Sequence, residues 1–297
     1  MKLCLGTVQF GMDYGVQGRG RPSETVVDEM LTYAFNQGIN CLDTAAAYGN
    51  AEEVIGNFIK KDKANLGNIQ IVTKMPSRIL ENNSDKAWTD VMLNYAEHSI
   101  KTLGVDKLYA YLFHHARHIF EKNAVKALES VTERGLAQKI GVSVYSPEEA
   151  MKALEHSEIK VIQIPYNVFD QRLDQCGFFQ KAKKIGVEIY ARSTLLQGLL
   201  MMNPESLPER MYFASDYLKR FLRLCIEYDI PPLKAAVGYV SASPYIDYMV
   251  FGVDNKKQLA EYIMIQEDAI PKEMISDLRA AFENVEEKLV NPVLWTQ

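Results

Sequence analysis

The sequence predicts a closed barrel of eight parallel strands, each followed by an outer helix, in a single domain that spans residues 1–297. Short runs rich in β-branched and aromatic residues alternate about eight times with longer helical patterns, which is typical of strand–helix–strand units. No low-complexity linker or strong internal repeat divides the chain. A doubly wound open sheet has the same alternation, but the chain length and the number of units favour the barrel.

The expected strands are short and apolar, and the stretches between them carry helix signals. The first helix is expected to open at Ser23 and to stop at Gly38, because glycine favours helix ends. A later helix begins with a capping box of Ser146 and Glu149, and Pro147 takes its first position. In chain order, the strands are expected over 2–8, 39–45, 69–75, 108–115, 138–145, 160–167, 187–193 and 247–253, and the helices over 23–38, 50–61, 146–157, 174–186 and 215–230.

Composition excludes several functional classes. The formal net charge is −5 and the Lys and Arg residues are scattered, so we expect no basic face for nucleic acid. No apolar run approaches the ~20 residues that span a bilayer, so we expect no membrane association. The four Cys form no C-x-x-C pair, which favours reduced thiols in a cytoplasmic protein. The sequence does not indicate an oligomeric state.

Three ionisable residues stand at the ends of consecutive expected strands. Asp43, Lys74 and His114 end the second, third and fourth strands, on the same faces as the apolar residues two positions earlier. In a barrel these ends meet at the carboxyl rim, where barrel enzymes carry their chemistry. The sequence therefore predicts that the three side chains lie close together.

Tyr48, five residues after Asp43, adds a phenol to this group. A buried Lys74 ammonium favours the phenolate and is expected to lower the pKa of Tyr48, and Asp43 supplies the counter-ion. This set suits a Tyr that donates a proton to a carbonyl oxygen, while His114 donates a hydrogen bond to the same oxygen. No side chain supplies a hydride, so the pattern predicts a nicotinamide cofactor and a small-molecule carbonyl substrate.

Four segments, in order along the chain, resemble the aldo-keto reductase family. "LDTAAAYGNAE" resembles the family's segment with an Asp and the catalytic Tyr, and "IVTK" its strand with the catalytic Lys. "LGVDKLYAYLFHH" resembles the segment in which the catalytic His comes eight residues after an Asp, which selects His114 over His115. "GVSVY", "VIQIPYN" and "ARSTLLQGLL" resemble its later cofactor-binding strands. The resemblance implies a (β/α)₈ barrel that reduces aldehydes or ketones with NAD(P)H, with Tyr48 as the proton donor.

The resemblance also implies a set of cofactor-binding residues. Ser143 and Gln163 match residues that hold the nicotinamide carboxamide. The loop over the pyrophosphate is matched by Ser193, Leu195 and Gln197.

This chain departs from the family pattern at several cofactor positions. Val144 stands where relatives often have Asn. Arg192 stands where they often have an aromatic residue that stacks on the nicotinamide, and a guanidinium can stack in its place. The resemblance implies NADPH as the cofactor, with NADH as the alternative. The residues expected near its 2′-phosphate end are Gly252, Lys256 or Lys257, and Gln258, in place of the family's Lys-Ser and Arg.

Other functions fit parts of the pattern. The altered positions Val144 and Arg192 leave open a nucleotide-binding barrel that senses redox state or regulates a partner with little turnover. The run His114-His115-x-x-His118 suggests a metal site. Adjacent residues of a strand point to opposite faces, however, so His114 and His115 should not bind the same ion, and we predict no metal. The Gly-rich residues 15–22 lack the third glycine of a dinucleotide fingerprint and are interpreted as a loop.

Overall fold

The computed structural model describes residues 1–18, 20–61, 68–266 and 268–295. Eight parallel strands close into a barrel in chain order, with β1 paired to β8. The strands are almost continuously apolar because one face meets the barrel interior and the other meets helices. The predicted barrel is thus confirmed. Its strands are β1 (Lys2–Gly6), β2 (Cys41–Asp43), β3 (Gln70–Lys74), β4 (Leu108–Phe113), β5 (Ala137–Ser143), β6 (Ile159–Pro165), β7 (Glu188–Arg192) and β8 (Tyr248–Phe251).

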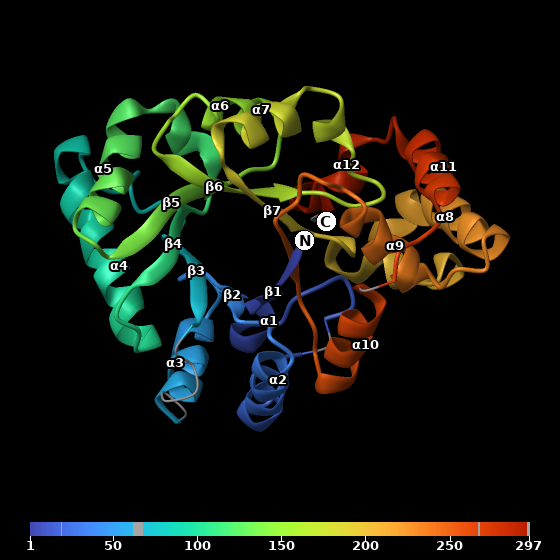
Figure 1. Ribbon diagram of the computed structural model, residues 1–297, viewed down its shortest axis with the longest axis horizontal. Coiled ribbons are helices and arrows are strands. Elements are labelled where there is room, and N and C mark those ends of the chain that lie inside the picture. The colour runs from blue at the N-terminus through green and yellow to red at the C-terminus, as the bar shows by residue number, and fades with distance from the viewer. Residues whose placement is uncertain (19, 62–67, 267, 296–297) are drawn as a thin grey trace.

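The helices form a layer around the strands (Figure 1). They are α1 (Val8–Gly11), α2 (Glu24–Asn36), α3 (Ala51–Lys61), α4 (Trp88–Leu103), α5 (Lys122–Glu133), α6 (Pro147–Ala153), α7 (Phe178–Ile185), α8 (Ser215–Glu227), α9 (Pro232–Ser241), α10 (Lys256–Gln266), α11 (Lys272–Phe282) and α12 (Glu287–Val290). Short 3₁₀ segments lie in the loops: η1 (Asp85–Ala87), η2 (Ala116–Phe120), η3 (Arg172–Asp174), η4 (Leu196–Met201), η5 (Pro204–Ser206), η6 (Glu209–Ala214) and η7 (Pro292–Trp295). Within the described ranges, no helix combines the length and apolarity needed to cross a bilayer.

Side chains cap two of the helices, and one of these caps is the expected capping box. The Ser23 hydroxyl accepts a hydrogen bond from the Val26 N–H before α2, and Ser146 with Glu149 forms the complete capping box of α6. The strands are shorter than expected. In particular, β4 ends at Phe113, so that His114 lies just beyond the strand.

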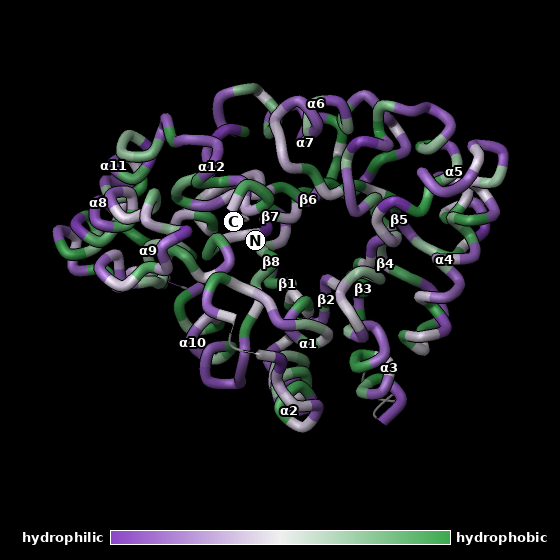
Figure 2. The backbone as a smooth tube through the Cα atoms, turned by 180° about the vertical axis from the view of Figure 1, so that it is seen from behind, coloured by the Kyte–Doolittle hydropathy of each residue, from purple (hydrophilic) through white to green (hydrophobic). Residues whose placement is uncertain are grey.

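Side chains alternate between the barrel interior and the helix layer. Cys41, Val72 and Leu112 belong to the cluster of buried side chains inside the barrel, whereas Leu42 and Ile71 belong to the larger core under the helices. Figure 2 shows long hydrophobic stretches along the central strands, and peripheral helices that alternate between hydrophobic and hydrophilic segments. Two residues after these interior positions come Asp43, Lys74 and His114, at the carboxyl rim of the barrel.

A polar network closes the amino-terminal end of the barrel. The Glu188 carboxylate accepts hydrogen bonds from Lys139 Nζ at 2.6 Å and from the Tyr109 hydroxyl at 2.9 Å. Lys139 Nζ also donates to the Tyr109 hydroxyl at 2.7 Å. These contacts join β4, β5 and β7 across the barrel at the end opposite to the rim.

Gly141 in β5 is expected to tolerate no side chain. An added Cβ would lie 2.0 Å from the carbonyl oxygen of Val161 and 2.7 Å from Leu112 Cδ2, with a paired strand on each side. We expect Gly141→Ala to lower the free energy of unfolding by about 1–3 kcal/mol in urea titrations. The exposed residue Gln138 in the same strand is the control, and Gln138→Ala should change it by no more than about 0.5 kcal/mol. Equal stability of the two variants would contradict the prediction.

Candidate active site

A cavity of about 460 Å³ lies at the carboxyl-terminal end of the barrel. This is the rim at which barrel enzymes build their sites, and the volume is in the range of small-molecule sites. Strand ends, the loops after β1, β2, β5 and β7, and residues of α9 and α10 line the cavity. The lining includes Gln9, Tyr14, Asp43, Tyr48, His114, Ser143, Tyr145, Arg192, Ser193, Thr194, Leu195, Gln197, Gly252, Asp254, Gln258 and Glu261.

Lys74 and Asp43 form an ion pair at the base of the cavity. Lys74 Nζ lies 2.7 Å from Asp43 Oδ1 and 2.9 Å from Oδ2, and it donates a further hydrogen bond to the Thr44 carbonyl oxygen at 2.9 Å. Lys74 is 1% exposed and Asp43 is 5% exposed. Gln163 Nε2 also donates to the Asp43 carboxylate. Each buried charge is therefore paired and hydrogen-bonded, which such charges require.

Tyr48 lies in the loop between β2 and α3, with its ring centroid 5.1 Å from Lys74 Nζ. Burial raises the pKa of Tyr48 and outweighs the opposing influence of Lys74, so that the pKa lies above its usual value rather than below it as the sequence had predicted. Burial acts against the ammonium of Lys74, but Asp43 outweighs it and raises the pKa of Lys74. At neutral pH, both Tyr48 and Lys74 therefore carry their protons.

His114 lies beside Tyr48 at the cavity wall. The two rings meet edge to face with centroids 5.6 Å apart. Burial, together with the charge of Lys74, lowers the pKa of His114 from 6.5 to about 3. The imidazole is therefore neutral at physiological pH, and one of its nitrogens donates while the other accepts.

His115 does not point away from His114. Their rings stack with centroids 5.4 Å apart and an interplanar angle of 19°. The expected opposite orientation was wrong because β4 ends at Phe113, and the alternation of side chains applies only within a strand. Among the residues that the structure describes, no group of three or more His, Cys, Asp or Glu residues is placed to hold a metal ion.

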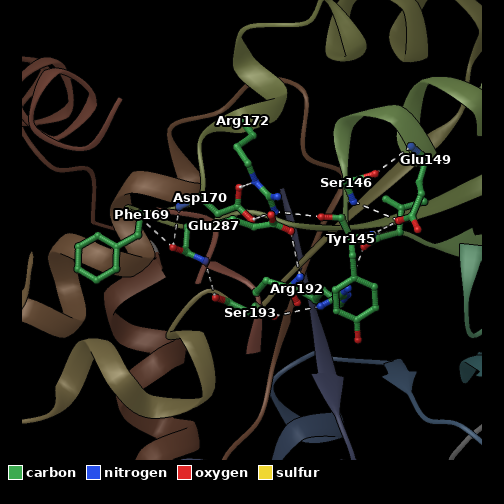
Figure 3. A network of polar contacts seen from close by, with 12 residues as sticks. Tyr145, Ser146, Glu149, Phe169, Asp170, Arg172, Arg192, Ser193 and Glu287 are labelled. Carbon is green, nitrogen blue, oxygen red and sulfur yellow. Dashed lines mark hydrogen bonds and ion pairs between the residues drawn. The ribbon is translucent and has the colours of Figure 1, made fainter. Parts of the chain in front are cut away.

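Arg192, at the end of β7, also lines the cavity, and Figure 3 shows it beside Ser193 and Tyr145. Its Nε donates to the Ser143 hydroxyl at 3.2 Å, and its Nη atoms donate to the Ser193 hydroxyl at 3.3 Å and the Val144 carbonyl oxygen at 2.8 Å. Its guanidinium lies 4.2 Å from the centroid of the Tyr145 ring. Arg192 thus stacks on a protein aromatic ring and fixes the ends of β5 and β7 relative to each other.

Tyr145 is a cavity residue that the sequence analysis missed. Its N–H donates to the Glu149 carboxylate at 2.6 Å, and its carbonyl oxygen accepts a hydrogen bond from Arg172 at 3.0 Å. Arg172 is in turn held by Asp170 at 2.8 Å, and Figure 3 shows these groups converging on the Tyr145 backbone. The capping-box Glu149 was visible in the sequence, but its second role in holding Tyr145 was not.

The loop after β7 closes over one side of the cavity. Ser193 and Gln197 have positive φ values of 62° and 55°, which curl the chain back toward the barrel. Asn167 Nδ2 donates to the Ser193 carbonyl oxygen at 3.1 Å, and the Val16 N–H donates to the Gln197 carbonyl oxygen at 3.1 Å. Leu195 also lines the cavity. The Gly-rich loop after β1, interpreted from sequence only as a loop, thus forms part of the cavity wall.

The β8–α10 segment closes the far side of the cavity. Gly252 approaches the Gln9 side chain so closely that a Cβ would lie 2.6 Å from its amide atoms. Gln258 lines the cavity beside it. Lys256 does not line the cavity, because its Nζ lies 5.1 Å from the ring centroid of Tyr33 on α2. Gln163 does not line it either, since its amide is turned to Asp43.

The cavity wall fits a polar ligand such as a nicotinamide dinucleotide. Gln9, His114 and Thr194 line the cavity, and each has one buried polar atom without a hydrogen-bond partner among the described residues. Such atoms are rarely left unpaired when a protein carries its ligand. The lining runs from the end of β4 to α10, so that it offers contacts to both ends of a long molecule.

Comparisons with known proteins agree with this geometry. Residues 2–283 match the model of the aldo/keto reductase family. The chain is 24% identical over 308 aligned residues to the uncharacterized oxidoreductase YrpG of Bacillus subtilis, covering 95% of this chain and 92% of that protein. An aldo-keto reductase of Gibberella moniliformis is 26% identical, and that match covers 65% of this chain and 59% of the relative.

A solved structure has the same fold. The holo form of an aldo-keto reductase from Bacillus halodurans superimposes with a TM-score of 0.75 at 22% identity, covering 94% of this chain and 91% of that one. This likeness extends the agreement to the arrangement of the whole barrel.

Breaking the Lys74–Asp43 pair is expected to destabilise the barrel. Lys74→Met leaves a carboxylate without its buried counter-ion, which should lower the free energy of unfolding by about 3–5 kcal/mol. The double variant Lys74→Met/Asp43→Asn removes both charges and should recover part of that loss. Urea titrations of the three proteins measure the difference. A double variant no more stable than Lys74→Met would contradict this account.

The lowered pKa of His114 predicts a specific pH dependence. Because the folded pKa is about 3 and the ordinary value is 6.5, the unfolded chain takes up the proton first as the pH falls. The contribution of His114 to stability is complete above pH 6.5 and decreases by about 1.4 kcal/mol per unit below it, until pH 3. We expect His114→Gln to lose less stability than the wild type between pH 7 and pH 5. Parallel pH profiles of unfolding would exclude this effect.

Proposed function

The chain belongs to the aldo/keto reductase family, and we propose that it reduces the carbonyl group of a small aldehyde or ketone, reversibly, with a nicotinamide dinucleotide as the hydride donor. The observation that carries the proposal is the protonated Tyr48 beside a neutral His114 and a buried Lys74–Asp43 pair. Tyr48 and His114 both line one cavity, so that both reach the same bound oxygen.

The nicotinamide ring, when bound, supplies the hydride to the carbonyl carbon. Tyr48 donates the phenolic proton to the carbonyl oxygen as that oxygen gains negative charge. His114 donates a hydrogen bond to the same oxygen and thereby orients the substrate. Because its imidazole stays neutral, His114 keeps one N–H for this bond without competing with Tyr48 as the proton source.

Lys74 and Asp43 support the proton transfer from below. When Tyr48 loses its proton, the nearby ammonium of Lys74 stabilises the phenolate, as its opposing influence on the Tyr48 pKa indicates. Asp43 keeps Lys74 charged despite its burial. Gln163 donates to the same carboxylate, so we propose that it positions Asp43.

The part of the cavity wall formed by the ends of β5 and β7 and the loop after β7 is proposed to hold the cofactor. Ser143 and Ser193 present hydroxyls to the cavity, and the loop with Leu195 and Gln197 covers its side. Arg192 offers a flat cation at the same wall, with its plane already set by three hydrogen bonds and the Tyr145 ring. Gly252, at the β8–α10 end of the cavity, has no side chain and lets the Gln9 side chain lie close to its backbone.

The family resemblance implies NADPH, with NADH as the alternative, and residues at the α10 end of the cavity bear on this choice.

The four cysteines are thiols, which supports a cytoplasmic location for the enzyme. A regulatory protein could bind a nucleotide in the same cavity. It would not need a protonated Tyr48 beside a neutral His114 and the Lys74–Asp43 pair.

Tyr48→Phe tests the proposal directly. It removes the transferred proton and keeps the ring, so we expect the turnover of aldehyde substrates to fall by roughly 10²–10⁴-fold while nucleotide affinity stays within a few-fold. Tyr212→Phe is the matched control, because that side chain is 63% exposed and lies outside the cavity lining. Equal turnover in Tyr48→Phe and wild type would falsify the assignment of Tyr48. Tight nucleotide binding without turnover in the wild type would favour the regulatory role.

A further inference from the structure

We propose that this chain binds NADH in preference to NADPH, because the ionisable side chains that the structure describes at the β8–α10 end of the cavity, where NADPH would carry its extra phosphate, are carboxylates. The inference rests on the proposed function, since it takes the cavity as the nucleotide site. It concerns Asp254, Gln258 and Glu261, which lie at the β8–α10 end of the lining.

The direction of the dinucleotide follows from the chemistry. The nicotinamide must lie near Tyr48 and His114, because the hydride and the proton go to the two atoms of one carbonyl group. The adenosine is the opposite end of the molecule, and the lining continues from His114 past the β7 loop to α10. The adenosine ribose, whose 2′ position alone distinguishes the two cofactors, therefore lies toward α10.

The charges at this end favour a ribose with free hydroxyls. Asp254 and Glu261, whose side chains are carboxylates, both line the cavity there. A carboxylate accepts hydrogen bonds from ribose hydroxyls, which is how dinucleotide sites commonly select NAD over NADP. A 2′-phosphate close to the same groups meets like charge and loses affinity.

Two backbone N–H groups near the start of α10 are hydrogen-bonded to side chains of the same segment. Gln258 Oε1 accepts the Asp254 N–H at 2.7 Å, and the Gln258 N–H donates to Asn255 Oδ1 at 3.0 Å. Helix N-termini bind phosphate through backbone N–H groups of this kind. Here those two N–H groups have partners, so that they are not offered to an incoming phosphate.

Among the described residues, no Lys or Arg lines the cavity at its α10 end. Arg192 is the single Lys or Arg among the described residues that line the cavity. Its hydrogen bonds to the Ser143 hydroxyl and the Val144 carbonyl oxygen hold it at the ends of β5 and β7. Lys256, the residue expected from sequence to meet the phosphate, places its ammonium over the Tyr33 ring. The described lining at the α10 end thus contributes no positive charge.

Binding titrations of the full chain with NADH and with NADPH test the inference. Fluorescence of the reduced nicotinamide reports binding without requiring turnover, and the ionic strength is kept equal because phosphate contacts depend on it. We expect NADH to bind at least about tenfold more tightly than NADPH. In Gln258→Arg/Glu261→Gln, which adds a cation and removes a carboxylate, the affinity for NADPH should rise about tenfold while that for NADH changes less.

Lys256→Gln is the matched control, because it removes a cation from the same helix outside the lining. It should leave both affinities unchanged. Tighter binding of NADPH to the wild type, or a selective loss of NADPH affinity in Lys256→Gln, overturns the inference and leaves the proposed function intact. If neither nucleotide binds, the proposed function fails, and this inference fails with it.

Discussion

The ion pair of Lys74 and Asp43 constrains everything around it, because two charges at 1% and 5% exposure survive only with partners on every side. β2 and β3 must run side by side in register, so that the carboxylate and the ammonium meet at 2.7 Å. β6 must reach the same level to let Gln163 donate to Asp43. A closed barrel satisfies both requirements, because it brings β2 beside β3 and β6 across the interior from β2. An open sheet would leave β2 and β6 far apart.

The helix layer supports the same pair from outside. Glu52 on α3 is a buried carboxylate that accepts hydrogen bonds from the Thr73 hydroxyl at 2.6 Å and the Ser99 hydroxyl at 3.2 Å. Thr73 precedes Lys74 and points to the opposite face of β3. The end of β3 is therefore held between a carboxylate on each face, Asp43 inside and Glu52 outside. Such double support gives Lys74 a fixed position relative to Tyr48.

The barrel and the grouping of Asp43, Lys74 and His114 were predictable because strand periodicity and strand ends are local signals. Contacts between distant parts of the chain were not. Tyr145 owes its position to Arg172, and Gln163 turns to Asp43 across 120 residues of chain. The position of Lys256 over the Tyr33 ring was not predictable either, because a helix start shows which residues are near the rim but not the direction of a long side chain. The pKa of Tyr48 depends on burial, which is a property of the assembled site.

The two halves of the site come from different stretches of the chain. The groups that handle the proton lie between residues 43 and 114, whereas the polar wall of the cavity is built mainly from residues 143 to 261. Apart from Gln163, which donates to Asp43, the described residues of the later stretch make no hydrogen bond to Lys74 or Asp43. One set of substitutions can therefore alter the proposed choice of nucleotide while another set alters the proposed proton transfer.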